Sequence, residues 1–171
     1  RQSGGTPREF CTITVTDGIA MGHEGMKSSL ISREVIADSA ELTVRGHCYD
    51  ALVGIAGCDK SLPGLMMSML RLNVPSVFIY GGSILPGKYK GKDVTVVDVF
   101  EAVGKHSSGS MSSEDLRELE LVACPSAGAC GGQFTANTMA CVSEAIGLAL
   151  PYSAGTPAPY EERDKYAKAS G

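Results

Sequence analysis

The sequence predicts an α/β fold with a mainly parallel sheet flanked by helices, and three observations support this prediction. Residues 11–16, 51–56 and 75–80 are short runs of β-branched or apolar side chains, which is typical of strands. Segments with helical periodicity separate these runs, and strands joined through helices pair in parallel with right-handed crossovers. Each run ends in a polar or glycine-rich segment, where open α/β sheets bind their ligands.

The predicted strands deliver different residues to this edge of the sheet. Residues 11–16 alternate polar and β-branched side chains, so Asp17, which follows, is expected at the carboxyl end of a strand. Residues 51–56 are almost wholly apolar, which predicts a strand buried on both faces. The segment Gly-Cys-Asp-Lys at 57–60 comes directly after it. Residues 75–80 form a third strand of the buried type and end in a Gly-Gly-Ser segment.

Helix signals fill the rest of the chain. Ser28 or Ser29 can cap the first helix, Asn73 ends the second, and Ser112 can cap the fourth. The methionines of the second helix indicate core packing, and the glycine-bounded basic segment at 87–91 is expected to be a solvated loop. The predicted helices are residues 32–45, 62–72, 96–106, 113–122, 133–148 and 160–169.

Length and composition predict a single α/β domain over residues 1–171. The chain is 43% hydrophobic and 20% charged. Its formal net charge is -4, and it has no cluster of basic residues that would attract nucleic acid. Its apolar runs are far shorter than the about 18 residues of a membrane span, and its first residues lack the apolar core of a signal peptide. A cytoplasmic protein without nucleic-acid or membrane partners is therefore expected.

The six cysteines indicate neither a disulfide framework nor a compact zinc finger. Cytosolic thiols are kept reduced, and no Cys-x-x-Cys pair is present. Any metal site must therefore draw its ligands from separate loops.

The segment at residues 57–60 has the highest density of reactive groups. A thiol (Cys58), a carboxylate (Asp59) and an amine (Lys60) follow one another at the end of a buried strand, and Gly57 allows the backbone to approach a ligand closely. The structural alternative is a packed, inert Cys58 beside an Asp59 that caps the next helix.

Two further segments combine glycines with reactive groups. Residues 124–132 contain Cys124 and Cys130 in a Gly-rich loop before a helix, and such a loop can offer backbone N–H groups to a cluster and favour a thiolate. An ordinary Gly-rich turn explains this pattern equally well. Residues 17–26 contain three glycines and His23, which could contact a substrate or phosphate or could simply stabilise the loop.

Four collinear segments together resemble the dihydroxy-acid dehydratase family, which also includes phosphogluconate and sugar-acid dehydratases. The segments are TVTDGIAMG at 14–22, SREVIADS at 32–39, AGCDKSLPG at 56–64 and GACGGQFTANTM at 128–139. The resemblance covers nearly the whole chain. It implies that residues 1–171 belong to the N-terminal cofactor-binding domain of a longer homodimeric enzyme, whose C-terminal β-barrel-like domain lies outside this sequence.

The resemblance also implies roles for five residues. Cys58 and Cys130 match two of the three cysteines that hold the family's Fe–S cluster, which is [2Fe–2S] or [4Fe–4S] depending on the member. Asp17 and Asp59 match Mg²⁺ ligands, and Lys60 matches a lysine that is carboxylated in some members. Because an ammonium group cannot coordinate a cation, Lys60 must be carboxylated if it is to bind Mg²⁺.

Other family residues are expected elsewhere. The third cluster cysteine lies upstream in the family, and the serine base and a further Mg²⁺-binding Glu lie in the C-terminal domain, so no catalytic residue is assigned here and the isolated chain is expected to be inactive. His23 and Gly131 are possible loop contacts. Cys48 and Cys141 match no ligand and are expected to pack in the protein, whereas Cys124 lies close in sequence to Cys130.

The implied chemistry is the dehydration of a 2,3-dihydroxy carboxylate to a 2-oxo acid, with iron as Lewis acid. The segments at 61–64 and 81–87 are closer to the enzyme of isoleucine and valine biosynthesis, whose substrates are 2,3-dihydroxy-isovalerate and 2,3-dihydroxy-3-methylvalerate. Dehydration of an aldonate or phosphogluconate is the alternative. Two other classes remain: a structural or binding module without a cluster, and a thiol enzyme with Cys58 or Cys130 as nucleophile and His23 as base.

Overall fold

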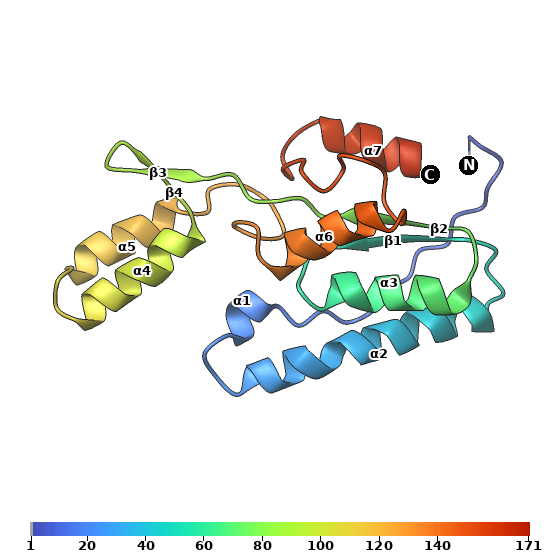
Figure 1. Ribbon diagram of the computed structural model, residues 1–171, viewed down its shortest axis with the longest axis horizontal. Helices are drawn as coiled ribbons and strands as arrows, with labels where there is room; N and C mark the ends of the chain where they lie inside the picture. Colours follow the sequence, from blue (N-terminus) through green and yellow to red (C-terminus); the bar gives the residue numbers. More distant parts are fainter. Residues whose placement is uncertain (1) are drawn as a thin grey trace.

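The computed structural model describes residues 2–171, which form seven helices and four short strands. A larger lobe holds β1, β2, α2, α3, α6 and α7, and a smaller lobe of β3, β4, α4 and α5 extends to one side (Figure 1). The elements are α1 (Asp17–Ala20), α2 (Gly25–Gly46), β1 (Leu52–Ala56), α3 (Ser61–Leu72), β2 (Ser76–Tyr80), β3 (Gly87–Tyr89), β4 (Lys92–Val94), α4 (Val96–Ser107), α5 (Ser113–Val122), α6 (Thr135–Ala145) and α7 (Glu162–Ser170).

The predicted α/β class with parallel pairing is confirmed, but the sheet is small. Strands β1 and β2 pair in parallel, with Leu52 opposite Ser76 and Ala56 opposite Tyr80. Helix α3 connects them, as the spacing of the two apolar runs predicts. The carboxyl ends of both strands therefore lie at the same edge.

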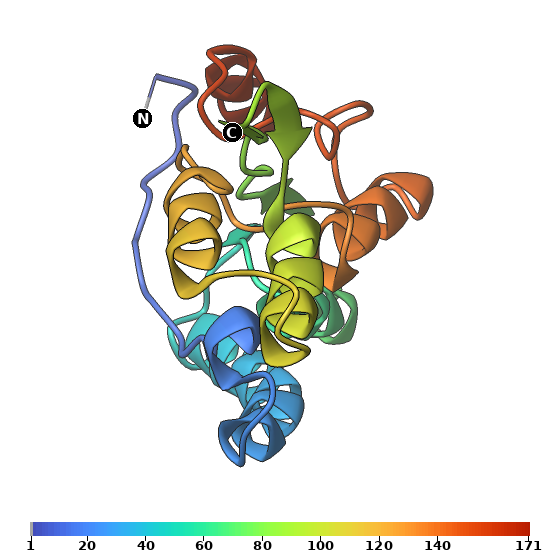
Figure 2. The same cartoon turned by 90° about the vertical axis from the view of Figure 1, so that its left-hand side faces the viewer.

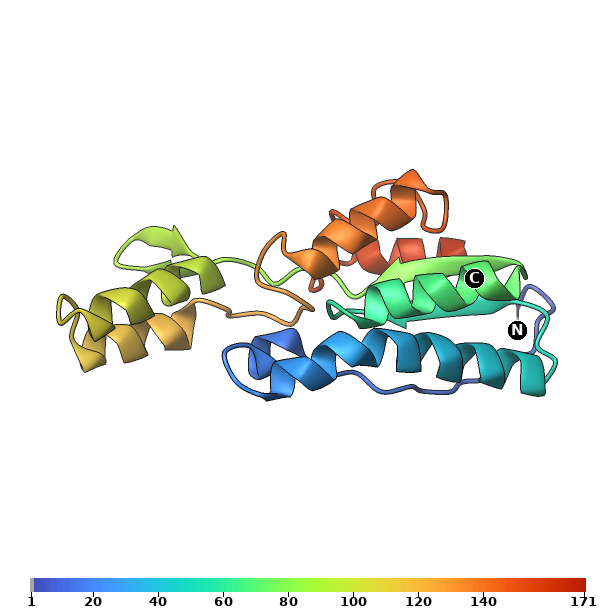
Figure 3. The ribbon, with the colours of Figure 1, turned by 60° about the horizontal axis from the view of Figure 1, so that its bottom comes forward.

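The prediction of a strand at residues 11–16 is wrong. This segment joins no sheet and runs alongside α2 (Figure 3). The hydroxyl of Thr12 lies 2.5 Å from that of Ser39 on this helix. Thr12 and Val15 are half-buried, whereas Ile13 is 50% exposed, so burial does not follow the alternation of the sequence. Asp17 begins the short helix α1 rather than following a strand.

Strand β1 is buried on only one face, contrary to the prediction of a strand buried on both. Val53 and Ile55 are 49% and 69% exposed, whereas Leu52 and Ala56 are buried. Helix α3 covers the buried face so closely that a Cβ at Gly54 would lie 2.4 Å from the Met69 methyl group.

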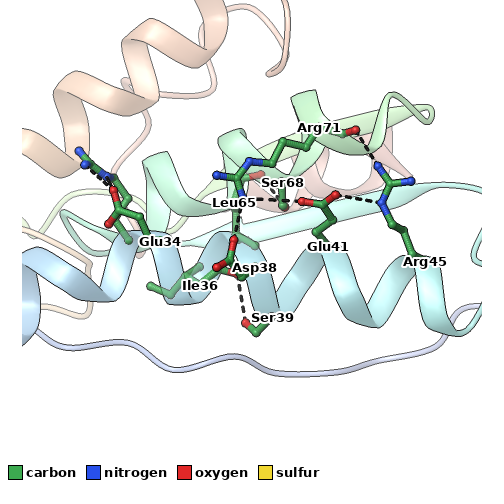
Figure 4. A network of polar contacts seen from close by, with 10 residues as sticks. Glu34, Ile36, Asp38, Ser39, Glu41, Arg45, Leu65, Ser68 and Arg71 are labelled. Carbon is green, nitrogen blue, oxygen red and sulfur yellow. Dashed lines mark hydrogen bonds and ion pairs between the residues drawn. The ribbon is translucent and has the colours of Figure 1, made fainter.

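The main core lies between this face of the sheet, α2, α3 and α6. Met66 and Met69 are buried in it, which confirms core packing for these methionines of α3. At its rim a polar network joins α2 to α3 (Figure 4). Arg71 Nη1 lies 2.7 Å from Asp38 Oδ1, and Arg45 donates both to Glu41 and to the Arg71 carbonyl.

The ends of several helices follow local sequence signals. Ser112 caps α5 by accepting from the backbone N–H of Asp115, and Asn73 ends α3 in the left-handed conformation with φ of 52°. By contrast, α2 begins at Gly25, before the predicted caps Ser28 and Ser29. Ser29 therefore lies inside α2 rather than at its N-terminal cap. Its buried hydroxyl donates a hydrogen bond to the Asp17 carboxylate.

The basic segment at 87–91 is part of a β-hairpin rather than a solvated loop. Lys90 and Gly91 both have positive φ, at 48° and 79°, as a two-residue type I′ hairpin turn requires. The hairpin packs on α5, and Val94, Ala102 and Leu119 form a second small core with it. Figure 2 shows α4 and α5 side by side in this lobe. Within residues 2–171, no helix has both the length and the apolar character needed to cross a membrane.

Candidate metal and cluster site

A pocket of about 430 Å³ gathers the three segments that the sequence singles out. It lies beyond the carboxyl ends of β1 and β2, between α1, the start of α4 and the start of α6. Its lining residues are Thr16, Asp17, Gly18, Met21, Cys58, Asp59, Ile84, Val96, Phe100, Cys124, Ala129, Cys130, Gly131, Phe134 and Thr135.

Close backbone packing brings the loop of Cys130 against the strand ends. The Ala129 N–H donates to the Gly82 carbonyl at 2.7 Å, and the Ile84 N–H donates to the Cys130 carbonyl at 2.9 Å. Ser83 and Cys130 thereby form a parallel bridge that extends the pairing beyond β2. A Cβ at Gly57 would lie 2.9 Å from the Cβ of Ala129, so a glycine at this position permits the close approach.

Two carboxyl groups and one amine meet on the α1 side of the pocket. Asp17 is 4% exposed, and its carboxylate lies 2.6 Å from Lys60 Nζ and accepts a hydrogen bond from the Ser29 hydroxyl. Burial works to raise the pKa of Asp17, but hydrogen bonds from Lys60 and Ser29 leave it below its ordinary value.

Asp59 shifts in the opposite direction. Burial and the neighbouring Asp17 carboxylate raise its pKa, although Lys60 and the Thr135 hydroxyl oppose the rise. Asp17 is therefore stabilised as the ionised partner of Lys60, whereas Asp59 is harder to ionise than an ordinary carboxyl group.

Thiols line another part of the same pocket. Cys58, Cys124 and Cys130 all contribute, and Cys58 Sγ lies 3.8 Å from the Val15 carbonyl oxygen. Burial raises the pKa of the Cys130 thiol, while hydrogen bonds from the backbone N–H groups of Gly132 and Gly131 lower it. These N–H groups are the donors that a metal-bound thiolate needs.

The other predicted or unassigned side chains lie differently. Cys48 and Cys141 are exposed, so the prediction that they pack in the protein is wrong. His23 is also exposed: its Nε2 lies 2.7 Å from the Ile19 carbonyl, and its Nδ1 accepts from the Gly25 N–H. Among the described residues the pocket lining includes no histidine, so His23 does not lie beside Cys58 or Cys130 there.

Some residues of the site carry no signal in the sequence. Ser29 and Thr135 hydrogen-bond the two carboxyl groups, but Ser29 has the pattern of a cap and Thr135 that of a helix residue. A second pocket of about 290 Å³ shares Ile84 and Gly131 with the first and adds polar side chains. Those side chains are Ser83, Thr95, Gln133 and Asn137.

The donor chemistry fits two different kinds of metal group. Carboxylate oxygens suit a hard cation such as Mg²⁺, and thiolates suit an iron–sulfur cluster. Within residues 2–171, no three His, Cys, Asp or Glu side chains are close enough together to hold an ion by themselves. A complete coordination sphere therefore needs further donors, and a carboxylated Lys60 is suitably located beside Asp17.

Comparisons with known proteins identify the family of this chain. The family model described as dihydroxy-acid/6-phosphogluconate dehydratase N-terminal matches residues 1–171. The chain is 92% identical to a dihydroxy-acid dehydratase of Pelagibacter ubique and 82% identical to one of Parvibaculum lavamentivorans, in each case over its whole length and 30% of the relative's. A dihydroxy-acid dehydratase of Metallosphaera sedula is 58% identical over the whole chain and 31% of its own length. The chain thus spans about a third of these relatives, and it belongs to the dihydroxy-acid/6-phosphogluconate dehydratase family.

Proposed function

We propose that this chain forms the cofactor-binding part of a hydro-lyase that dehydrates 2,3-dihydroxy carboxylates to 2-oxo acids. The observation that carries the proposal is the convergence of carboxylates and thiols from three distant segments on one pocket. The names of the relatives support the same reaction. The remaining donors and the base would come from the rest of a longer polypeptide.

Each class of donor side chain has a metal group that it is proposed to bind. Cys58 and Cys130 would hold a [2Fe–2S] or [4Fe–4S] cluster, and Asp17, Asp59 and carboxylated Lys60 would hold Mg²⁺. These groups supply Lewis acidity toward the leaving hydroxyl of the substrate and positive charge for its carboxylate. Because Cys58 and Asp59 are adjacent, one strand end fixes the distance between the two kinds of donor.

The side chains of this chain prepare these positions. Loss of a proton from the Lys60 ammonium group gives a neutral amine, whose attack on CO₂ forms an N–C bond and releases a second proton. The cationic partner of Asp17 thereby becomes an anionic oxygen donor. The Ser29 hydroxyl then keeps Asp17 oriented, and Thr135 does the same for Asp59. The N–H groups of Gly131 and Gly132 donate to the Cys130 sulfur and would stabilise its thiolate once a metal is bound.

The walls of the pocket favour a branched-chain substrate. Met21, Val96, Phe100 and Phe134 give the pocket an apolar side. Such a wall removes the alkyl groups of 2,3-dihydroxy-isovalerate or 2,3-dihydroxy-3-methylvalerate from water, but it offers no partner to the extra hydroxyls of a sugar acid. Isoleucine and valine biosynthesis is therefore the proposed pathway, with aldonate or phosphogluconate dehydration as the alternative.

Activity of the full-length protein tests the reaction and the substrate together. Formation of 2-oxo acid from 2,3-dihydroxy-isovalerate should exceed formation from gluconate or 6-phosphogluconate. The reverse preference would establish sugar-acid dehydration, and a protein inactive on all three would favour a structural or binding module. A homodimer in the cytoplasm is part of the proposal, and size-exclusion chromatography with light scattering tests the dimer.

Variants test the ligands. Cys58→Ser should lose iron and inorganic sulfide, whereas Cys48→Ser, which changes an exposed cysteine outside the pocket, should retain both. Lys60→Ala should lose Mg²⁺-dependent turnover, and mass spectrometry in bicarbonate should detect a mass increase on Lys60. Iron content in Cys58→Ser equal to that of the unaltered enzyme would remove Cys58 from the cluster.

A further inference from the structure

Ile84, which follows the carboxyl end of β2, lies between the pocket of the candidate site and the second pocket. The two linings share Ile84 and Gly131, so among the described residues Ile84 is the one side chain beyond glycine that borders both pockets. Its chain neighbours in space divide between them, since Val96 lines the first pocket and Thr95 lines the second. The pockets are therefore adjacent, and the Ile84 side chain forms part of the wall that separates them.

The two pockets offer a ligand different chemistry. The first combines carboxylates and thiols with an apolar side. The second, of about 290 Å³, is lined by the hydroxyl or amide side chains of Ser83, Thr95, Gln133 and Asn137. Hydroxyl and amide groups both donate and accept hydrogen bonds, which suits a polyhydroxylated chain and not an alkyl group. The second pocket thus has the partners that the apolar side of the first pocket lacks.

Contacts with the loop of Cys130 hold Ile84 in place. Its backbone N–H donates to the Cys130 carbonyl at 2.9 Å. A Cβ at Gly128 would lie 2.6 Å from Cγ1 of Ile84, so the isoleucine side chain packs directly on the backbone of this glycine. The next residue, Leu85, donates its N–H to the Ser126 hydroxyl at 2.8 Å. The wall between the pockets is therefore fixed relative to the thiol side of the first pocket.

We propose that Ile84 determines the substrate class by closing the polar second pocket to the substrate. The inference rests on the proposed function, in which the substrate carboxylate binds on the side of Asp17 and Asp59 and its C3 lies near the thiols. Atoms beyond C3 then lie close to Cys130 and to Ile84 beside it. In 2,3-dihydroxy-isovalerate these atoms are methyl groups, which pack on isoleucine. In gluconate they are hydroxylated carbons, which lose their hydrogen-bond partners against isoleucine.

The full-length enzyme with Ile84→Ala tests the proposal. This truncation opens the wall and exposes the hydroxyl and amide groups of the second pocket to the substrate. The ratio of kcat/KM for gluconate to kcat/KM for 2,3-dihydroxy-isovalerate should rise at least about tenfold, the lower end of what one methylene changes in an apolar pocket. The matched control is Ile55→Ala, which truncates a 69% exposed isoleucine of β1 outside both linings and should leave the ratio unchanged.

A second substitution tests where the longer substrate binds. Gln133→Leu, added to Ile84→Ala, removes an amide from the second pocket and should abolish most of the gain on gluconate. Turnover of 2,3-dihydroxy-isovalerate by this double variant should match that of Ile84→Ala, because the shorter substrate does not reach the second pocket. Gluconate should also raise the melting temperature of Ile84→Ala more than that of the unaltered enzyme, which measures binding without turnover.

Each contrary result has a distinct meaning. An unchanged ratio in Ile84→Ala of normal iron content would overturn the role of Ile84 but leave the proposed function intact. A gain on gluconate that survives Gln133→Leu would also overturn it, because the polar pocket would then not receive the substrate. Should Ile84→Ala fail to fold, Ile84→Val must show a smaller rise of the ratio, and no rise would count against the proposal equally. An unaltered enzyme that prefers gluconate would overturn the proposed substrate and the inference together.

Discussion

Replacing Gly57 with alanine should force apart the two loops that carry Cys58 and Cys130. The added Cβ would lie 2.9 Å from the Cβ of Ala129, the residue before Cys130. Carbon atoms pack best at about 3.5–4.0 Å, so the loops must separate by ~1 Å or the contact must be strained. Overpacking of this kind costs about 1–3 kcal/mol. We expect Gly57→Ala to lower the free energy of unfolding by that amount and to weaken iron binding.

Chemical denaturation of the cluster-free full-length protein measures the first effect, and iron per protomer after reconstitution measures the second. The variant Ala129→Gly removes the opposing methyl group. The double variant Gly57→Ala/Ala129→Gly should therefore recover much of both losses, because it moves one methyl group from one loop to the other. Unaltered stability and iron content in Gly57→Ala alone, or no recovery in the double variant, would refute this reasoning.

Three further predictions concern regions outside the pocket. The Cβ that Gly104→Ala adds in α4 would have no neighbouring atom within 4 Å. Because alanine is the better helix former, this variant should raise the free energy of unfolding by about 0.5–1 kcal/mol, measured by denaturation. Arg71→Met breaks the 2.7 Å ion pair with Asp38 at the α2–α3 rim, and it should cost only about 0.2–1 kcal/mol, less at high salt, because both partners are partly exposed. A hydrogen bond from Lys90 holds the pKa of Asp115 at about 2. Stabilisation by this carboxylate is complete above its ordinary pKa of 3.8 and is lost as the pH falls toward 2, so circular dichroism should show a weaker acid dependence of unfolding in this interval for Asp115→Asn.

Local signals predicted the parts of the fold that depend on neighbouring residues. Ser112 caps α5 through an N–H three residues away, and Asn73 ends α3 by its own conformation, so both effects can be predicted from adjacent sequence. The strand predicted at residues 11–16 is wrong because strand formation needs a partner. The hydrogen bonds that could make it a strand depend on residues far along the chain, and this segment lies on α2.

Some residues of the candidate site could be predicted from the sequence, and others could not. Contiguous residues revealed Cys58, Asp59 and Lys60, because one strand end carries all three. Ser29 and Thr135 could not be found, since their roles arise from contacts with carboxyl groups distant in sequence. What positions a reactive group is thus less visible in sequence than the group itself.

The two classes of donor are held by separate supports and can therefore be disturbed separately. The Cys130 loop depends on close packing against the strand ends, whereas Asp17 depends on the fully buried hydroxyl of Ser29 in α2. Ser29→Ala should therefore weaken Mg²⁺ binding about 10–100-fold, as loss of an outer-shell partner typically does, while iron content stays unchanged. Ser32→Ala is the matched control, because that equally buried hydroxyl donates only to the Ser29 carbonyl within α2. Measuring the Mg²⁺ dependence of turnover beside iron content separates the outcomes. If Ser29→Ala lost both iron and Mg²⁺ affinity, the thiol and carboxylate donors would not be positioned independently of each other.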